Sequence, residues 1–137
     1  MVNKRILLVE DDFMNMRLAK YILEVEGYTV ITAATAQEAL EQIESSLPDL
    51  LLMDMQLPDM DGLTVVRILR QRAATRDMTI LALTACAMKG DRERILQMGC
   101  DGYITKPIDV QNFINTVKRF LNERNRTKTN EKGACYR

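Results

Sequence analysis

Short runs of apolar residues alternate along this chain with segments in which apolar residues recur at helical spacing. Residues 6–9 and 50–53 are entirely apolar, a pattern typical of strands buried on both faces of a parallel sheet. The pattern predicts strands at 6–9, 28–32, 50–53, 79–83 and 102–104, and helices at about 13–26, 35–47, 63–72, 89–98 and 110–121. We therefore expect an α/β protein with a (βα)5 chain, whose helices cover both faces of the sheet.

The helical segments differ in their pattern of apolar positions. In the first, Met14, Leu18, Ile22 and Val25 fall near one face, and Gly27 ends the helix. The second begins near Thr35, which suits an N-cap position. The segment 89–98 is polar and ends before a glycine, so we expect it to be the least firmly anchored helix.

Length and charge then set the domain organisation. A chain of 137 residues is long enough for one ordinary domain and too short for two. Nineteen basic residues balance nineteen acidic ones, so we expect no nucleic-acid partner and no membrane surface. Basic residues gather in the segment 124–137, which lacks a hydrophobic period. We expect a domain over residues 1–123 and a basic, disordered tail over 124–137.

Histidine is missing from the chain, which excludes imidazole catalysis, histidine metal ligands and a phosphohistidine of its own. The cysteines Cys86, Cys100 and Cys135 are odd in number and widely spaced, which argues against a disulfide framework and favours the reducing cytoplasm. We expect Cys86 and Cys100 to be small buried residues and Cys135 to be an exposed thiol. No apolar run is long enough for a membrane span.

Ionisable or hydroxyl side chains follow four of the predicted strands: Glu10, Asp11, Asp12, Asp54, Thr84 and Lys106. Ligands of parallel sheets bind beyond the carboxyl ends of the strands, so these groups are expected to meet. Gathered carboxylates need a compensating cation, and oxygen ligands favour Mg²⁺, Mn²⁺ or Ca²⁺. The charge of Lys106 and the hydroxyl of Thr84 suit a phosphoryl group. Asp54, at the middle strand, is then the best candidate nucleophile for an acyl phosphate.

These residues and their surroundings resemble the response-regulator receiver domain of two-component signalling. The segments LLVEDD, LLMDMQLPDMDG, ILALTA and GYITKP are all close to the family pattern, and the resemblance covers roughly residues 4–122. It implies a flavodoxin-like, doubly wound fold with a five-stranded parallel sheet of order 2-1-3-4-5. It also points to the stand-alone type of regulator that is similar to chemotaxis response regulators.

The resemblance implies a role for each matching residue. Asp54 would accept phosphate from a partner's phosphohistidine. Asp12 and Asp54, with the main-chain carbonyl of Gln56, would bind Mg²⁺ directly, and Asp11 would act mostly through water. Lys106 would pair with the acceptor carboxylate or its phosphate.

The same resemblance implies a switch around the phosphate. Thr84 would move towards a phosphoryl oxygen, and Tyr103 would turn inward into the space vacated. Ala85 is small, as the position beside the phosphate requires, and the Lys106–Pro107 peptide bond would be cis. Gln56 and Cys86 occupy positions at which the family tunes hydrolysis.

Three acidic residues near the site have simpler interpretations. We expect Glu10 to face solvent. Asp59 and Asp61 lie in the loop after the acceptor, and turn formation explains both.

The function we expect is a phosphorylation switch, not an enzyme acting on outside substrates. A sensor histidine kinase or histidine phosphotransfer protein would supply the phosphate. The output would be binding of an effector protein to the surface formed by the helix at 89–98, the strand at 102–104 and the helix at 110–121. We expect a cytoplasmic monomer or a weak, phosphorylation-dependent dimer.

Three other functions compete with this one. The chain could be the receiver part of a hybrid histidine kinase or a phosphorelay shuttle that passes phosphate onward; its start at Met1 and short tail favour a stand-alone protein. A phosphohydrolase is disfavoured because Met55 and Gln56 stand where a second acid is usually needed, and no cap segment is present. A phosphate-independent interaction module is disfavoured because every chemical position is filled.

Overall fold

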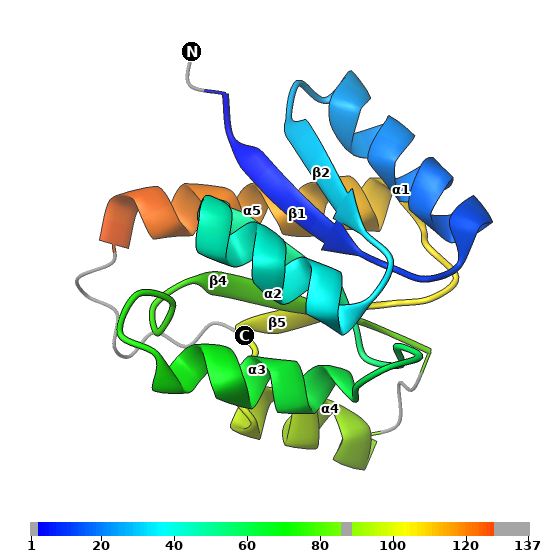
Figure 1. The fold of residues 1–137 in the computed structure, drawn as a ribbon. Coiled ribbons are helices and arrows are strands. Elements are labelled where there is room, and N and C mark those ends of the chain that lie inside the picture. Colours follow the sequence, from blue (N-terminus) through cyan, green and yellow to red (C-terminus); the bar gives the residue numbers. More distant parts are fainter. Residues whose placement is uncertain (1–2, 86–88, 128–137) are drawn as a thin grey trace.

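Five parallel strands and five helices alternate along the chain in the computed structural model, which describes residues 3–85 and 89–127 (Figure 1). The strands are β1 (Arg5–Val9), β2 (Thr29–Ala33), β3 (Leu50–Asp54), β4 (Thr79–Thr84) and β5 (Gly102–Thr105). The helices are α1 (Phe13–Val25), α2 (Ala36–Ser45), α3 (Gly62–Gln71), α4 (Lys89–Gln97) and α5 (Val110–Thr127). All strand pairs are parallel and follow the order β2-β1-β3-β4-β5. The predicted fold class and strand order are both confirmed.

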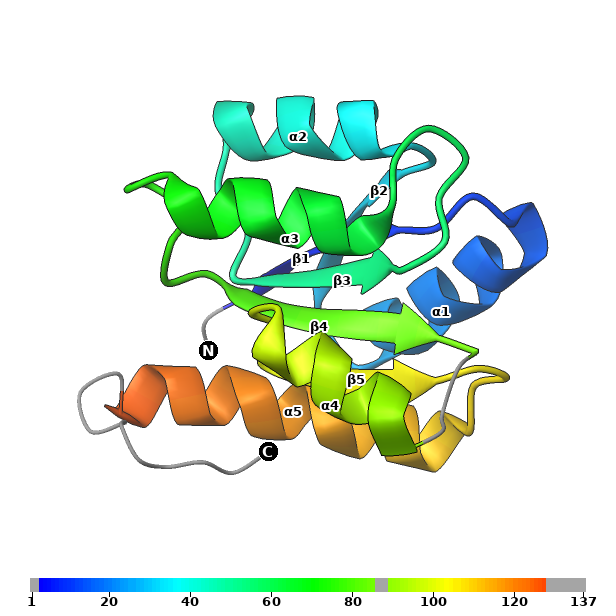
Figure 2. The same cartoon turned by 90° about the horizontal axis from the view of Figure 1, so that it is seen from below.

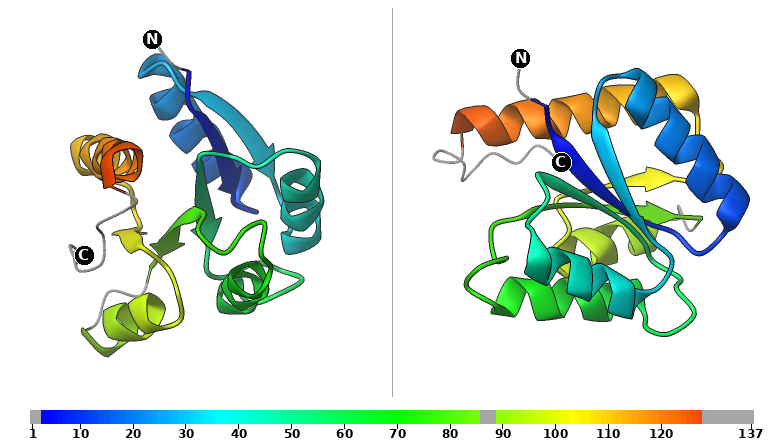
Figure 3. Two further views of the ribbon diagram at one scale, coloured as in Figure 1. Left: turned by 90° about the vertical axis from the view of Figure 1, so that its left-hand side faces the viewer. Right: turned by 45° about the horizontal axis from the view of Figure 1, so that its top comes forward.

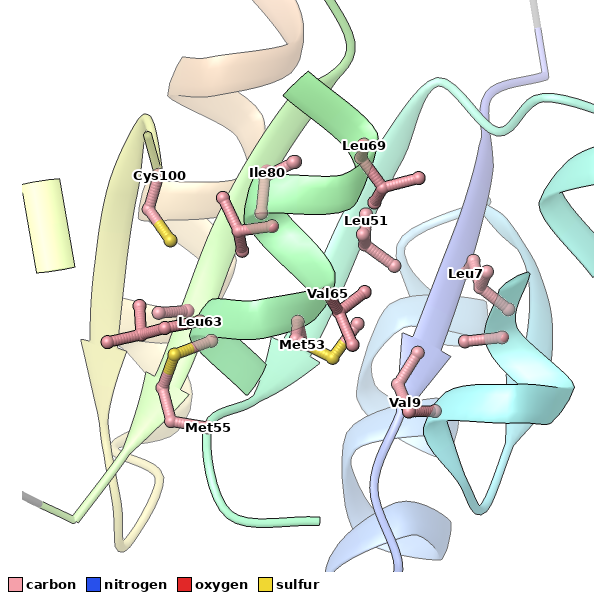
Figure 4. Packing of buried hydrophobic residues seen from close by; sticks show 14 of the residues in the cluster. Leu7, Val9, Leu51, Met53, Met55, Leu63, Val65, Leu69, Ile80 and Cys100 are labelled. Carbon is pink, nitrogen blue, oxygen red and sulfur yellow. The ribbon is translucent and has the colours of Figure 1, made fainter. Parts of the chain in front are cut away.

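Each strand contributes alternate residues to two separate cores, because successive side chains point to opposite faces of a sheet. One core lies beneath α2, α3 and α4 and includes Leu7, Leu51 and Ile80 (Figures 2 and 4). The other core lies beneath α1 and α5 (Figure 3). It includes the strand residues Leu8 and Leu52 together with buried residues of the two helices. Burial on both faces explains why the strands read as uninterrupted apolar runs.

Helix α2 begins, and α1 and α4 end, at or near the residues that the sequence indicated as caps. The side chain of Thr35 caps α2 by accepting a hydrogen bond from the backbone N–H of Glu38 at 3.1 Å. Gly27 and Gly99 follow α1 and α4 with φ angles of +99° and +118°, a backbone region that other residues rarely adopt. Of the α4 side chains that the structure describes, Ile95 is the only buried hydrophobic one, in agreement with the polar pattern of this helix.

The face of α1 that packs on the sheet is not the one that apolar spacing indicated. Ala19, Ile22 and Leu23 are its buried residues, whereas Met14 and Val25 are 71% and 64% exposed. Apolar residues occur around most of this helix, so periodicity alone does not determine which side is buried. Packing against the sheet selects the side that carries a small residue, which lets the helix approach the strands closely.

The last helix extends into the segment that we predicted as a tail. Helix α5 continues to Thr127, so residues 124–127 are helical, although we expected the tail to begin at 124. Extending an existing helix is far easier than starting one, so α5 continues through residues 124–127 although they have no hydrophobic period. Residues 128–137 lie outside the described part of the chain. Within the described residues, no helix has the length and apolar character to cross a bilayer.

Arg70 of α3 ties together the end of the sheet that lies opposite the carboxyl ends of the strands. Its guanidinium donates hydrogen bonds to the carbonyl oxygens of Gly99 at 2.9 Å, Arg76 at 2.8 Å and Met78 at 2.6 Å. It also forms an ion pair with Asp101 at 3.0 Å, and Asp101 accepts a hydrogen bond from a backbone N–H of β4. Two connections of the chain, between α3 and β4 and between α4 and β5, therefore depend on one side chain.

Substitution of Arg70 by alanine is expected to lower the free energy of unfolding by about 2–3 kcal/mol, because carbonyls and a carboxylate lose charge-assisted hydrogen bonds. Arg67→Ala is the matched control, since Arg67 lies on the same helix and is exposed. Urea unfolding monitored by circular dichroism measures both variants. Equal losses of stability in the two would show that the Arg70 contacts contribute nothing specific.

Candidate functional site: an acidic cluster at the carboxyl edge of the sheet

Three carboxylates converge where β1 and β3 end side by side. Glu10 follows β1 directly, Asp54 is the last residue of β3, and these strands pair so that Val9 lies opposite Met53. Oxygen atoms of Glu10, Asp11 and Asp54 all lie within 4.8 Å of one another. Glu10 and Asp54 are buried and Asp11 is exposed, so the cluster opens to solvent on one side.

Lys106 supplies the compensating positive charge from the loop after β5. Its Nζ lies 3.0 Å from Asp54 Oδ2 and 3.3 Å from Glu10 Oε1. Burial alone lowers the pKa of Lys106, but the hydrogen bond to Asp54 and the two nearby carboxylates outweigh burial and raise that pKa. Lys106 is therefore a fixed cation beside the Asp54 carboxylate, as predicted.

The loop after β3 holds the other oxygen of Asp54. Asp54 Oδ1 accepts a hydrogen bond from the backbone N–H of Gln56 at 2.9 Å, so both carboxylate oxygens have a donor. Gly62 closes this loop and packs directly against its start. A Cβ at Gly62 would lie 2.7 Å from Cα of Met55 and 2.9 Å from the Asp54 carbonyl oxygen, closer than any side chain tolerates.

Glu10 does not face solvent, contrary to our expectation. Its side chain is 2% exposed, contacts Lys106, and accepts a hydrogen bond from the backbone N–H of Asp12 at 3.2 Å. Burial raises the pKa of Glu10 to about 7, and the neighbouring Asp54 adds to this rise. The signal that sequence reasoning overlooked was position: Glu10 is the residue that leaves β1 directly beside the end of β3.

Asp12 is not part of the cluster, although we expected it to bind the metal directly. Its side chain caps α1 and accepts hydrogen bonds from the backbone N–H groups of Met14 at 3.0 Å and Asn15 at 3.1 Å. Direct metal binding by Asp12 therefore has no support from its position in the structure. Asp12 marks the start of the helix, and Glu10 with Asp11 completes the cluster around Asp54.

The remaining predicted site residues surround the same edge. Thr84 is the last residue of β4 and is buried, Ala85 follows it and is exposed, and Tyr103 on β5 is half-buried. A cavity of about 130 Å³ beside the acceptor loop is lined by Gln56 and Thr84, among others. The Lys106–Pro107 bond is cis, as predicted.

Similarities to known sequences and to solved structures bear on this arrangement. The sequence pattern of the response regulator receiver domain matches residues 6–118. The polar-differentiation response regulator DivK of Brucella ovis is 43% identical over 122 residues, which cover 89% of this chain and 99% of that protein. The chain belongs to the response-regulator receiver domain family.

Solved receiver structures share its fold over almost their full length. A CheY-like receiver domain protein from Methanospirillum hungatei is 35% identical with a TM-score of 0.82, covering 90% of this chain and 98% of that one. The signal receiver domain of a signal transduction histidine kinase from Syntrophus aciditrophicus is 31% identical with a TM-score of 0.82, covering 96% and 99%. Receivers from different signalling contexts are thus similar to this chain.

The cluster of this receiver domain fits a hard divalent cation. All of its side-chain donors are carboxylate oxygens, the set that Mg²⁺ prefers over softer metals. Three close carboxylates carry more negative charge than Lys106 alone can balance, so a cation would relieve their repulsion. Glu10, Asp11 and Asp54 are the residues that could hold it. The predicted contribution of the Gln56 carbonyl stays a prediction.

Asp59 has a role in the receiver that turn chemistry did not reveal. Its two carboxylate oxygens accept hydrogen bonds from the backbone N–H groups of Ala36 at 2.9 Å and Gln37 at 3.1 Å, at the start of α2. These bonds lower the pKa of Asp59. Asp61 is the N-cap of α3. Asp59 therefore fastens the acceptor loop to a helix that is distant in sequence.

The cysteines of the receiver domain are only partly described. Cys100 is 3% exposed, and burial raises the pKa of its thiol to about 12, so it is the small buried residue that we expected. Cys86 and Cys135 lie outside the described residues. No redox role follows for Cys100, because its thiolate is strongly disfavoured.

Proposed function

We propose that this receiver domain is a phosphorylation switch in which Asp54 accepts a phosphoryl group from a phosphohistidine of a sensor kinase or phosphotransfer protein. The observation that carries the proposal is the buried Asp54 carboxylate, held by Lys106 at 3.0 Å within a cluster of three acids that is open on one side. Both partner classes lie outside the chain, since it contains no histidine.

In the proposed reaction an oxygen of Asp54 attacks the phosphorus atom and the phosphorus–nitrogen bond breaks. The imidazole leaves with the electron pair of that bond and takes up a proton, and Asp54 becomes a mixed anhydride. Lys106 stabilises the negative charge on the transferring oxygens. Glu10, Asp11 and Asp54 would hold Mg²⁺, which would supply positive charge to balance the phosphoryl oxygens.

The proposed readout runs from Thr84 to the surface of α4, β5 and α5. Thr84 ends the strand next to Asp54, and the aromatic ring of Tyr103 on β5 lies 5.7 Å from the guanidinium of Arg92 on α4. Ordering of Thr84 by a phosphoryl group would shift Tyr103 and α4 between two arrangements, of which an effector protein binds one. The domain acts in this way as a switch, not as an enzyme for outside substrates.

A second setting for the same chemistry has specific support. The matched domain from Syntrophus aciditrophicus is part of a signal transduction histidine kinase and covers almost all of this chain. The chain would then serve as the receiver part of a hybrid kinase or as a phosphorelay shuttle. Transfer of phosphate from labelled protein to a separate histidine phosphotransfer domain would favour this setting over an effector switch.

Metal removal tests the proposal directly. We expect the protein to gain one phosphoryl group, seen in its intact mass, when it is incubated with a small acyl phosphate or phosphoramidate and Mg²⁺. EDTA is expected to lower the initial rate at least about 100-fold, because the acidic cluster repels the donor's phosphate without a cation. An unchanged rate in EDTA would contradict the role of the cluster as a metal site.

A further inference from the structure

Most large exposed hydrophobic side chains of the described residues lie on a single helix. Seven such residues are exposed, and five of them are on α1: Phe13, Met14, Leu18, Tyr21 and Val25. Scattered apolar residues on a surface need no explanation, but a concentration on one helix marks an interaction surface. Figure 1 places this helix at the periphery of the molecule, next to the edge strand β2.

Four of these residues form one stripe along the helix, which we call the outer stripe: Met14, Leu18, Tyr21 and Val25. Their spacings of 4, 3 and 4 residues keep them on the same side of a helix with 3.6 residues per turn. Ala19, Ile22 and Leu23, which α1 buries against the sheet, lie on a different side. The outer stripe is therefore a second apolar face, with the spacing of a coiled-coil seam.

The outer stripe is symmetric in a way that suits a second copy of the same helix. Its spacing reads the same from either end, so two antiparallel copies bring Met14 opposite Val25 and Leu18 opposite Tyr21. Each contact then occurs twice around a twofold axis, as in an isologous interface. A partner of unrelated sequence would not require this symmetry.

Charges beside the stripe favour the same antiparallel arrangement. Arg17 and Glu24 lie seven residues apart, hence on the same edge of the stripe, with the basic residue nearer the start of the helix. Antiparallel pairing brings Arg17 of each copy near Glu24 of the other, whereas parallel pairing places these edges of the two copies on opposite sides of the seam. Residues that flank a helical seam set partner and orientation in this way.

The contacts that Arg17 and Glu24 make within one copy are weak enough for both side chains to form new ion pairs with a second copy. Glu24 pairs with Lys20 at 3.9 Å, with both side chains about half exposed, and the guanidinium of Arg17 lies 5.6 Å from the ring centre of Phe13. Exposed pairs of this kind contribute little stability and rearrange easily. Neither Arg17 nor Glu24 belongs to the acidic cluster around Asp54.

We propose that α1 is a self-association surface, through which two copies of this chain pair antiparallel by their outer stripes with reciprocal Arg17–Glu24 contacts. A single helix pair is at the small end of specific interfaces, so the dimer is weak and reversible. It is distinct from the effector surface proposed for α4, β5 and α5, and it needs no phosphorylation.

Charge exchange between two variants tests this pairing. Arg17→Glu places acid against acid in a homodimer, and Glu24→Arg places base against base, so we expect each alone to weaken dimerisation about tenfold. An equimolar mixture restores both attractive contacts in a heterodimer, as does the double variant R17E/E24R in its own homodimer. Sedimentation velocity over a range of about 10 µM to 1 mM measures the dimer fraction for this weak class of affinity.

Leu18→Glu, which puts a charge in the centre of the stripe, is expected to abolish the dimer. Leu47→Glu is its matched control, because Leu47 is 49% exposed and Leu18 is 46% exposed, but Leu47 lies outside α1. Thermal melts of every variant check folding, and the mixture compares two proteins that each fold alone. A wild-type protein that stays monomeric throughout, or a mixture that dimerises no better than its components, would overturn the proposal and leave the stripe to a different protein.

Discussion

Asp54→Asn will abolish phosphoryl uptake while leaving the fold intact. An amide is isosteric with the carboxylate, and its single oxygen keeps one of the two hydrogen bonds, from Lys106 or from the Gln56 backbone, but it does not form an acyl phosphate. The initial rate with a small acyl phosphate should fall by at least about 1,000-fold, to the background of the assay. Intact-mass measurement over time follows the loss, and a thermal melt confirms the fold.

Asp59→Asn is the control for this experiment, because it makes the same chemical change in the same loop. Asp59 faces the start of α2, not the acidic cluster, so phosphoryl uptake should persist while the melting temperature falls slightly. Wild-type uptake by Asp54→Asn, with the label on another residue, would show that the acceptor is misassigned.

Glu10→Gln is expected to weaken Mg²⁺ binding by about 10- to 100-fold, because one of the three clustered carboxylates is lost. Asp12→Asn should leave the Mg²⁺ affinity within about twofold, since asparagine caps a helix as well as aspartate does. A ligand that binds the folded state raises the melting temperature with its concentration, so thermal melts in a Mg²⁺ series measure both affinities.

These two variants also separate the metal site that the sequence predicted from the acidic cluster in the structure. The sequence interpretation assigned a direct metal ligand to Asp12 and a solvent-facing position to Glu10, whereas in the structure Asp12 caps α1 and Glu10 is buried in the cluster. A large loss of affinity in Asp12→Asn with little change in Glu10→Gln would restore the original assignment. Glu10→Gln removes the charge at residue 10 and keeps one side-chain oxygen, which can still accept a hydrogen bond from Lys106 or from the Asp12 backbone N–H.

Signals that depend on near neighbours in the chain were reliable. The apolar runs at 6–9 and 50–53 became buried strands, Thr35 became a helix cap, and glycine followed the two helices expected to end with it. Each rests on interactions within a few residues, or on burial of every side chain in a short run. Asp54 and Lys106 were predicted for a related reason, because the carboxyl ends of parallel strands meet at one edge.

Sequence signals were not reliable where the outcome depends on the direction in which a side chain points. Residues 10–12 are all acidic and connect the end of β1 to the start of α1. Which of them faces β3 depends on where the strand ends and where the helix begins. Composition is nearly uniform across this junction, so the sequence does not distinguish a metal ligand from a helix cap. Asp59 illustrates the same limit, because its partners lie more than twenty residues earlier in the chain.

By itself, the sequence determined the alternation of strands and helices, the absence of histidine chemistry and the edge at which the acidic residues collect. The tertiary structure alone decided which acids form the cluster and which side of α1 packs against the sheet, leaving Met14, Leu18, Tyr21 and Val25 exposed. The physical reason is that a strand buried on both faces needs only a run of apolar residues, and such a run can be recognised in the sequence itself. The orientation of a side chain at a strand end or on a largely apolar helix is chosen by contacts with distant segments.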